Sequence, residues 1–378
     1  MKNRKFEFIP VNEPLFDGRE LEYLTQCIQS GWVSSEGSFV QQFEQELSAR
    51  TTRRFGISVS SGTAALEVAV AALGLENGDE VILPTHTIIS CVSALIRRNV
   101  KPVLVDTDLA TWNMDVGKVE SAITSQTKAI MVVHTFGLPV DMDPIIELAK
   151  KYSLMIIEDA AQAIGLTYKE RPCGSFGNIS TFSFYPNKHI TTGEGGMILC
   201  DDPLLAKRSR SYRNLCFQES KRFVHEELGW NYRMSNLHAA LGMAQLETLP
   251  EHLQQKRSNG LYYKELLVGT PGLILPPNDK PYSNNYFWVF GILLGKELDV
   301  SAVTAMAKLK ERGIGTRPFF WPMHEQPVFQ RMNLFNNESY PVAELFGRRG
   351  FYIPSGLTLT RQQQQRIVET LVELLRIN

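Results

Sequence analysis

The chain has 378 residues, of which 43% are hydrophobic and 21% charged, so it is long enough for about two domains with sizeable cores and too apolar for a disordered protein. Its 39 basic and 40 acidic residues leave a formal charge of −1, which argues against nucleic acid or an anionic membrane as a partner. No apolar run approaches the roughly 18 residues of a membrane span, and five scattered cysteines without a CxxC pair favour a reducing cytoplasm over a disulfide framework or a zinc site.

The first half of the chain predicts two helices followed by alternating strands and helices. Apolar spacing predicts a helix over 17–30 and a second helix capped by Ser38. Further along, the strands are expected at 57–60, 79–83, 103–106, 129–133 and 154–158, and the helices at 63–73, 88–97, 116–123 and 143–151. Continuous apolar strands between amphipathic helices predict an α/β domain with a largely parallel sheet.

The second half predicts a pair of neighbouring strands and then a smaller domain. The pair covers 181–185 and 196–200, and long helices follow at 235–249 and 252–268. A proline-rich stretch around 271–281 marks a change of composition, after which we expect a strand at 286–294, a helix at 301–312, irregular structure and a closing helix at 361–376. We therefore predict a large α/β domain over 1–250 and a small α+β domain over 251–378.

The stretch Ser60-Ser61-Gly62-Thr63 follows a predicted strand and opens a helix. Free N–H groups at a helix N-terminus, together with the Thr63 hydroxyl, favour an anion, and Gly62 permits close approach of a phosphate. An ordinary helix cap is the alternative. Because the stretch is neither GxGxxG nor GxxxxGK[ST], it argues against a dehydrogenase or a kinase.

Two further residues complete a pattern. Asp159 ends a buried strand, where it either caps the next helix or faces a cationic ligand. Lys188 lies between two strands in a glycine-containing loop, where it is either solvated or a nucleophile toward a carbonyl carbon. An anion cradle, an acid and a lysine in this order suit pyridoxal phosphate, whose phosphate, ring nitrogen and aldehyde need these three groups.

The motifs SSGTAAL, GDEVILP, EDAAQA, FSFYPNKHITTGEGG and GWNYRMSNLHAALG resemble, over nearly the whole chain, those of the DegT/DnrJ/EryC1/StrS sugar aminotransferases. That resemblance implies a fold-type I pyridoxal phosphate enzyme with a mostly parallel central sheet flanked by helices. The stretches NKHITTGEGG and GTRPFFWPMHEQPVF are most similar to the family branch that aminates C4 of GDP-4-keto-6-deoxymannose, forming GDP-perosamine, with L-glutamate as donor.

The resemblance also implies roles for individual residues. Lys188 would hold the cofactor's aldehyde and shuttle protons. The other cofactor-binding positions would be Gly62, Thr63 and Ser183 at the phosphate, Asp159 at the ring nitrogen, Gln162 near the ring hydroxyl, and Asn231 reaching the phosphate from a neighbouring subunit. A homodimer with shared active sites follows from that last role. Arg233, in the same motif as Asn231, would meet a substrate carboxylate or an acid across the dimer interface.

The family pattern is broken at one cofactor position, and three further residues are expected at the substrate. The family's stacking aromatic is replaced by Ile88, so either His86 covers the ring or the ring is held less tightly. Arg317, Trp321 and His324 would flank the sugar or its diphosphate, although an aromatic prolyl loop is also good core material. No metal is expected.

Several alternatives remain at this point. One is amination, at C3 or C4, of another nucleotide keto-deoxysugar that carries dTDP or UDP. A second is the sugar 3-dehydratase branch, which needs a residue other than lysine at position 188. The others are an enzyme that acts on amino acids, such as a cysteine desulfurase, and a non-enzymatic regulator.

Overall fold

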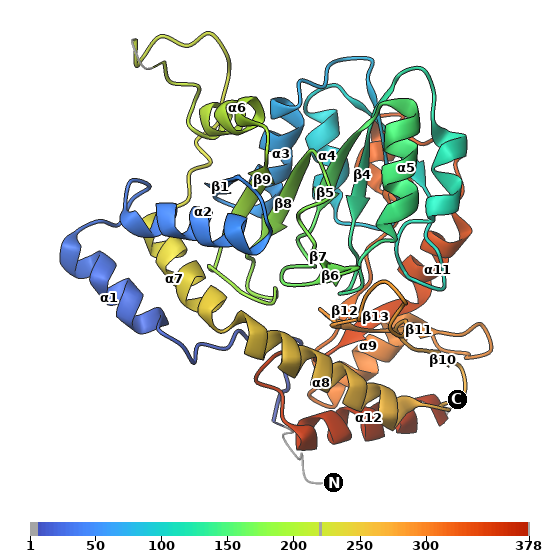
Figure 1. Cartoon of the computed structure of the whole chain (residues 1–378). Helices are drawn as coiled ribbons and strands as arrows, with labels where there is room; N and C mark the ends of the chain where they lie inside the picture. The colour runs from blue at the N-terminus through green and yellow to red at the C-terminus, as the bar shows by residue number, and fades with distance from the viewer. Residues whose placement is uncertain (1–6, 219–220, 377–378) are drawn as a thin grey trace.

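A computed structural model describes residues 7–218 and 221–376 (Figure 1). Its main feature is a seven-stranded sheet with the strand order β1-β9-β8-β5-β4-β2-β3. The strands are β1 (Phe55–Val59), β2 (Glu80–Pro84), β3 (Lys101–Val105), β4 (Thr127–Val133), β5 (Met155–Asp159), β8 (Ile179–Ser183) and β9 (Gly196–Cys200). A small hairpin of β6 (Thr167–Tyr168) and β7 (Arg171–Pro172) lies between β5 and β8 in sequence.

Only β9 runs against the other strands of this sheet. The pairs β2–β3, β2–β4, β4–β5 and β5–β8 are parallel, whereas β9 pairs antiparallel with β8 on one side and β1 on the other. Gly196 makes this fit possible, because a Cβ there would lie 2.4 Å from the Ser61 carbonyl oxygen. The carboxyl ends of β1, β2, β5 and β8 therefore meet at one edge, where ligands of α/β proteins bind.

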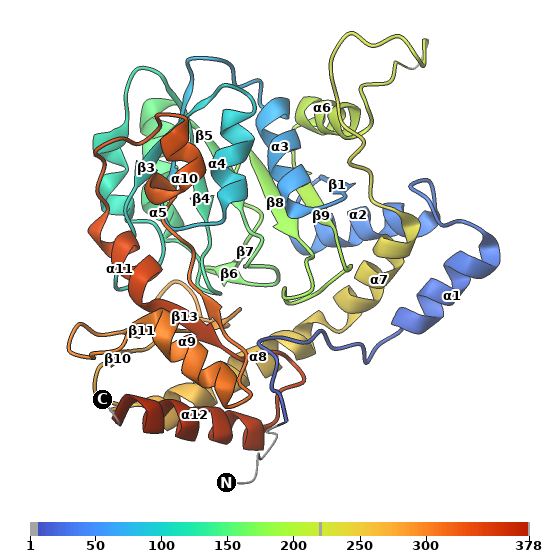
Figure 2. The same cartoon turned by 180° about the vertical axis from the view of Figure 1, so that it is seen from behind.

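Helices cover both faces of this sheet (Figures 1 and 2). One face packs against α3 (Gly62–Ala72), α4 (Ile89–Ile96) and α6 (Pro203–Arg213); the other packs against α2 (Ser38–Arg50), α5 (Met142–Tyr152) and α7 (Asn236–Glu247). The alternation follows the strand period: in β4, Met131 faces the α3 side and Ile130 the α5 side. The predicted α/β class with a mostly parallel sheet is confirmed.

A second, antiparallel sheet lies at the other end of the molecule (Figure 2). Its strands, in spatial order, are β10 (Leu273–Ile274), β11 (Phe290–Leu294), β13 (Gly350–Ile353) and β12 (Arg317–Pro318). It shares a core with α8 (Leu249–Leu267), α9 (Ala302–Glu311) and α12 (Arg361–Arg376). The division into 1–250 and 251–378 stays our proposal; Ile9, from the other end of the chain, also packs in this second core.

Some local predictions were wrong. Segment 116–123 forms two short 3-10 turns, Val116–Lys118 and Glu120–Ala122, because Gly117 and the brevity of the segment do not sustain an α-helix. Ser38 is the first residue of α2 rather than its cap, a position that Gly37 takes. The stretch after 312, expected to be irregular, holds β12, β13, a 3-10 turn (Met323–Glu325), α10 (Pro327–Arg331) and α11 (Pro341–Arg349).

The remaining helix, α1 (Glu20–Ser30), projects from the body beside α2 (Figure 1). Within residues 7–218 and 221–376, no helix is long and apolar enough to cross a bilayer.

Candidate active site

A cavity of about 430 Å³ opens at the edge where β1, β5 and β8 end. Its floor comes from the large sheet. Its roof comes from Arg317 and Tyr352 in the second sheet and from Trp288 and Phe320, which lie just before β11 and just after β12. The cavity brings together most of the residues predicted from sequence: Gly62, Thr63, Ile88, Asp159, Gln162, Ser183, Lys188 and Arg317.

The start of α3 forms an anion cradle at one end of the cavity. The Ser61 hydroxyl caps the helix by accepting from the Ala64 N–H at 3.1 Å. The N–H groups of Gly62 and Thr63 belong to the first turn and have no acceptor within the helix. A Cβ on residue 62 would lie 2.6 Å from the Ser183 Cβ, so glycine lets the cradle and β8 close on one another. The N-terminal helix dipole and these groups suit a phosphate.

Asp159 also lines the cavity, and no cationic side chain among residues 7–218 and 221–376 forms a salt bridge with it. Its Oδ1 accepts from the Ala161 N–H at 3.0 Å and its Oδ2 from the Cys91 thiol at 3.3 Å. Burial raises the pKa of Asp159, although these hydrogen bonds and the charge of Lys188 oppose the rise. A protonated ring nitrogen would give this carboxylate the cationic partner that a buried charge requires.

The preceding acid, Glu158, points to the other face of β5 and is already satisfied. It accepts from His134 Nε2 at 3.0 Å, from Ser180 Oγ at 3.0 Å and from the Phe176 N–H at 2.8 Å. Burial opposes ionisation, but the hydrogen bond and charge of His134 outweigh it, so the pKa of Glu158 is lowered. Of these two neighbouring carboxylates, Asp159 is thus the one open to a ligand.

Gln162 is oriented by the backbone. Its Oε1 accepts from the Phe136 N–H at 2.8 Å, so its amide nitrogen remains to donate to a ligand oxygen. This side chain is buried and lines the cavity, as the prediction of a contact to a ring hydroxyl requires.

Lys188 faces the cavity from the loop between β8 and β9. Burial lowers the pKa of its ammonium to about 8, although Asp159 partly opposes the shift. Its Nζ lies 3.9 Å from the centre of the Trp288 ring, and the Trp288 indole N–H donates to the Asn187 carbonyl at 2.7 Å. Trp288 therefore holds both the amine and the loop that carries it.

These donors and acceptors fit pyridoxal phosphate. The cradle matches its phosphate, Asp159 its ring nitrogen, Gln162 its hydroxyl and Lys188 its aldehyde, and all four line one cavity. The roles themselves remain those that we propose.

Of Ile88 and His86, the two residues predicted to cover the cofactor ring, only one faces the cavity. Ile88 lines the cavity with an exposed fraction of 41%. His86 is instead buried among Phe136, Phe319, Phe320 and Phe346, and burial lowers its pKa to about 3. Of the two candidates, Ile88 therefore lines the cavity and His86 does not.

Only one of the three residues predicted to contact the substrate lies at the cavity. Arg317 lines the cavity, but Trp321 and His324 do not. His324 is buried between Thr85 Oγ1, 3.1 Å from its Nδ1, and Glu344 Oε1, 3.2 Å from its Nε2. Its ring thus joins β2 to the start of α11.

Sequence reasoning missed part of the cavity wall. Tyr185 and Asn187 lie in the same motif as Lys188 and were within its reach. Trp288, Phe320 and Tyr352 carry no local signal because they lie in or beside strands of the second sheet, far from the motif in sequence.

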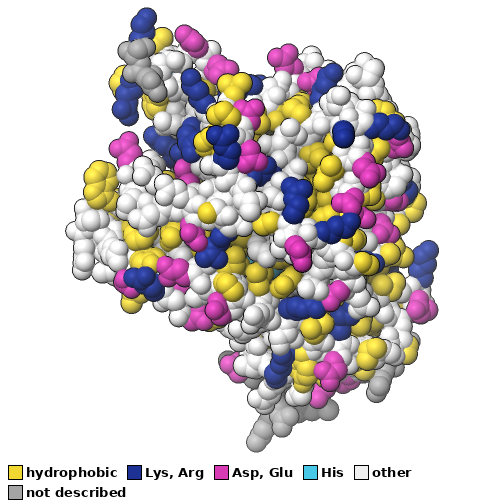
Figure 3. Space-filling model, viewed as in Figure 1, with side chains coloured by type: hydrophobic (Ala, Val, Ile, Leu, Met, Phe, Trp, Pro, Cys, Tyr) yellow, Lys and Arg dark blue, Asp and Glu magenta, His cyan; other side chains and the backbone are white. Residues whose placement is uncertain are grey.

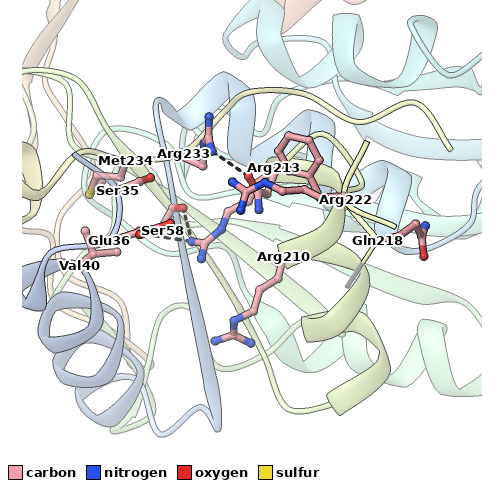
Figure 4. A pocket seen from close by; sticks show the side chains of 12 residues that line it. Ser35, Glu36, Val40, Ser58, Arg210, Arg213, Gln218, Arg222, Arg233 and Met234 are labelled. Atoms are coloured by element: carbon pink, nitrogen blue, oxygen red, sulfur yellow. Dashed lines mark hydrogen bonds between the residues drawn. The ribbon is translucent and has the colours of Figure 1, made fainter. Parts of the chain in front are cut away.

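Asn231 lies outside the cavity, near a different hollow of about 470 Å³ beside β1 (Figure 4). Arginines surround this hollow, and Lys and Arg side chains gather over α6 and the segment after it (Figure 3). Arg233 Nε donates to Asn231 Oδ1 at 2.9 Å and its Nη1 to Asn214 Oδ1 at 3.0 Å, while Arg213 pairs with Glu44 at 2.6 Å. Asn231 is exposed and does not line the lysine cavity of its own chain.

Comparison with known proteins agrees with this geometry. The chain is 38% identical over 97% of its length to GDP-perosamine synthase of Escherichia coli O157:H7, of which it covers 98%, and 37% identical to that of Caulobacter vibrioides over the same shares. The crystal structure of DesV from S. venezuelae superposes with a TM-score of 0.86 at 31% identity, covering 94% of both chains. A family profile matches residues 14–372. The chain belongs to the DegT/DnrJ/EryC1/StrS aminotransferase family and is a pyridoxal phosphate-dependent transaminase.

Proposed function

We propose that this enzyme transfers the amino group of L-glutamate to C4 of GDP-4-keto-6-deoxy-D-mannose, giving GDP-perosamine and 2-oxoglutarate. The observation that carries the proposal is Lys188, whose amine, with a pKa of about 8, faces the same cavity as Asp159 and the α3 cradle. The two relatives named GDP-perosamine synthase support the choice of nucleotide sugar.

Pyridoxal phosphate, when bound, supplies an aldehyde that exchanges amines and a ring that withdraws electrons from the substrate carbon. The chain supplies the rest. The α3 cradle fixes the phosphate, and the Asp159 carboxylate keeps a proton on the ring nitrogen. Lys188 Nζ takes a proton from the glutamate Cα and later delivers one to the sugar C4. Its lowered pKa allows it to act as base and acid near neutral pH.

Arg317 gives the cavity a cation for the two substrates. It is exposed, and no acidic side chain among residues 7–218 and 221–376 forms a salt bridge with it. Its guanidinium can therefore meet a glutamate carboxylate in one half-reaction and a sugar phosphate in the other.

We propose further that the enzyme is a homodimer in which Asn231 of one copy completes the cavity of the other. Support comes from its exposed position and from nearby apolar surface. The helix α1 and the segment after α6 lie on the same side of the molecule (Figures 1 and 2). Both carry exposed apolar side chains, Leu21 (80%) and Ile28 (65%) on α1 and Phe223 (80%) and Leu228 (91%) on the segment, which a second copy would cover. All five cysteines are free, which favours the cytoplasm.

The test follows the two half-reactions by absorbance. Glutamate should convert the lysine-bound cofactor band to that of the amine form, and GDP-4-keto-6-deoxymannose should restore it. Lys188→Ala should lose both changes, whereas Lys280→Ala, at a loop outside the cavity, should retain them. Restoration by a dTDP or UDP keto-sugar alone would overturn the assigned substrate, and loss of the sugar C3 hydroxyl without amine transfer would indicate a dehydratase.

A further inference from the structure

A second, smaller chamber adjoins the lysine cavity. It has a volume of about 180 Å³ and shares four wall residues with the cavity: Tyr185, Asn187, Arg317 and Tyr352. Its outer wall comes from the N-terminal segment around Val11 and Asn12. The two spaces thus meet at Arg317, on the far side of the cavity from the α3 cradle.

Arg317 stands at the junction for a structural reason. It lies directly opposite Tyr352 in the β12–β13 pair, so both side chains lie on the same face of the second sheet. Its positive charge opposes the rise that burial causes in the pKa of Tyr352. A forked cation that forms no salt bridge with an acid of the described residues, at the mouth of two spaces, suits a diphosphate.

The chamber also offers unsatisfied hydrogen-bond acceptors. Asn187 Oδ1 is buried and has no partner among the described residues. Asn12 uses its Nδ2 to donate to the Pro186 carbonyl at 3.1 Å, which leaves its Oδ1 as an acceptor. A buried acceptor without a donor costs free energy until a ligand supplies one. Ribose hydroxyls and the N–H groups of a base are donors of this kind.

Most of the other residues that line the chamber are aromatic or aliphatic. Tyr185, which is 51% exposed, and Tyr352 offer aromatic faces, and Val11, Pro14 and Pro186 line the chamber beside them. Such walls favour a planar ring over a charged group.

We propose that this chamber binds the nucleoside of the sugar nucleotide, with the diphosphate at Arg317 and the keto-sugar in the lysine cavity. The inference rests on the proposed function, because it assumes a nucleotide-linked substrate. It assigns the N-terminal segment, which carries none of the proposed cofactor-binding residues, to substrate recognition.

The experiment measures binding without turnover, by calorimetric titration of the pyridoxal phosphate-loaded enzyme with GDP and, by competition, with inorganic pyrophosphate. Arg317→Gln should weaken both ligands at least about tenfold. Val11→Phe, which fills the chamber, should weaken GDP at least about tenfold and leave pyrophosphate within about twofold. Asn12→Leu should act in the same direction as Val11→Phe, and Arg331→Gln, on α10 outside both spaces, should change neither ligand. Cofactor absorbance and melting temperature verify that each variant folds.

Any other result would overturn one part of the proposal: the nucleoside chamber, the diphosphate site or the GDP substrate. Unchanged GDP affinity in both Val11→Phe and Asn12→Leu would overturn the chamber, and unchanged affinity in Arg317→Gln would overturn the diphosphate site. If the enzyme binds dTDP or UDP in the same Arg317-dependent and Val11-dependent way but not GDP, the chamber stands and the proposed GDP substrate fails. If it binds none of the three, the chamber assignment fails, whatever the half-reactions show.

Discussion

Lys188 Nζ lies over the face of Trp288, 3.9 Å from the ring centre, although 100 residues separate the two in sequence. The same indole donates its N–H to the Asn187 carbonyl, so one side chain from the segment that leads into β11 contacts both the reactive amine and its loop. The position of the amine therefore depends on packing between the two sheets.

This relationship predicts graded effects at Trp288. Trp288→Phe keeps a ring over the amine but loses the bond to Asn187 O, a loss of about 1 kcal/mol, so we expect the glutamate half-reaction to slow roughly fivefold. Trp288→Leu also loses the cation–π contact and should slow it further, by roughly 20-fold in all. Single-turnover absorbance measures both rates at saturating glutamate. Equal rates in wild type and Trp288→Leu would show that the contact does not position Lys188.

Asp159→Asn should separate cofactor binding from catalysis. The amide keeps the size of the side chain but cannot hold a proton on a ring nitrogen, so we expect kcat to fall by about 10²-fold or more. Asp159→Glu, which keeps the charge, should recover part of the rate. Stopped-flow kinetics and cofactor titration measure the two effects. An Asp159→Asn enzyme with wild-type kcat would assign this carboxylate to structure alone.

The pKa of Lys188 predicts the pH dependence of cofactor uptake. Only the neutral amine attacks an aldehyde, and its fraction rises with pH up to the pKa, which is about 8. The rate at which the cofactor-free enzyme takes up pyridoxal phosphate should therefore rise about tenfold per pH unit below 8 and level off above it. Absorbance between pH 6 and 10 tests this. A rate still rising at pH 10 would mean that burial does not lower this pKa.

A second buried lysine predicts a pH effect on stability. Lys256 Nζ donates to the carbonyls of Trp288 at 3.0 Å and Ser355 at 2.7 Å, and burial lowers its pKa from 10.5 to about 7. Between pH 7 and 10.5 the Lys256 amine binds more protons in the unfolded chain than in the folded one. The free energy of unfolding therefore increases as the pH rises, because the cost of burying this amine falls.

Comparison with Lys256→Met isolates this contribution. The free energy of unfolding of wild type relative to the variant should be larger at pH 9 than at pH 7, as measured by urea denaturation. A difference that stays constant or shrinks with pH would contradict the lowered pKa.

The parts of the site that sequence predicts are those built from one strand and the residues after it. Thr63, Asp159 and Lys188 each follow or join buried strands, and parallel strands bring such ends to one edge. Tyr352 lies in a sheet formed by segments far apart in the chain, and Trp288 lies just before one of its strands, so no local pattern identifies either residue. His324 was expected at the substrate because of its motif, but its two hydrogen bonds depend on where β2 and α11 lie.

In the fold, too, elements with a strong local signal are predictable and elements that depend on long-range pairing are not. Apolar runs predict β4 and β5 because burial on both faces leaves a strong signal. Segment 341–353 forms the short helix α11 and the strand β13. The helix is too short for a clear apolar periodicity, and the strand pairs only with β11 and β12, which are distant in sequence, so the local sequence indicates neither element.

The reversed strand β9 has a consequence for the dimensions of the site. It is wedged between β1, which leads into the α3 cradle, and β8, which leads into the Lys188 loop, with Gly196 against the Ser61 carbonyl. The spacing between the groups that would grip the two ends of the cofactor is therefore set by three adjacent strands. Because these strands are hydrogen-bonded to one another, they keep that spacing constant even where the surrounding loops change to admit a different sugar.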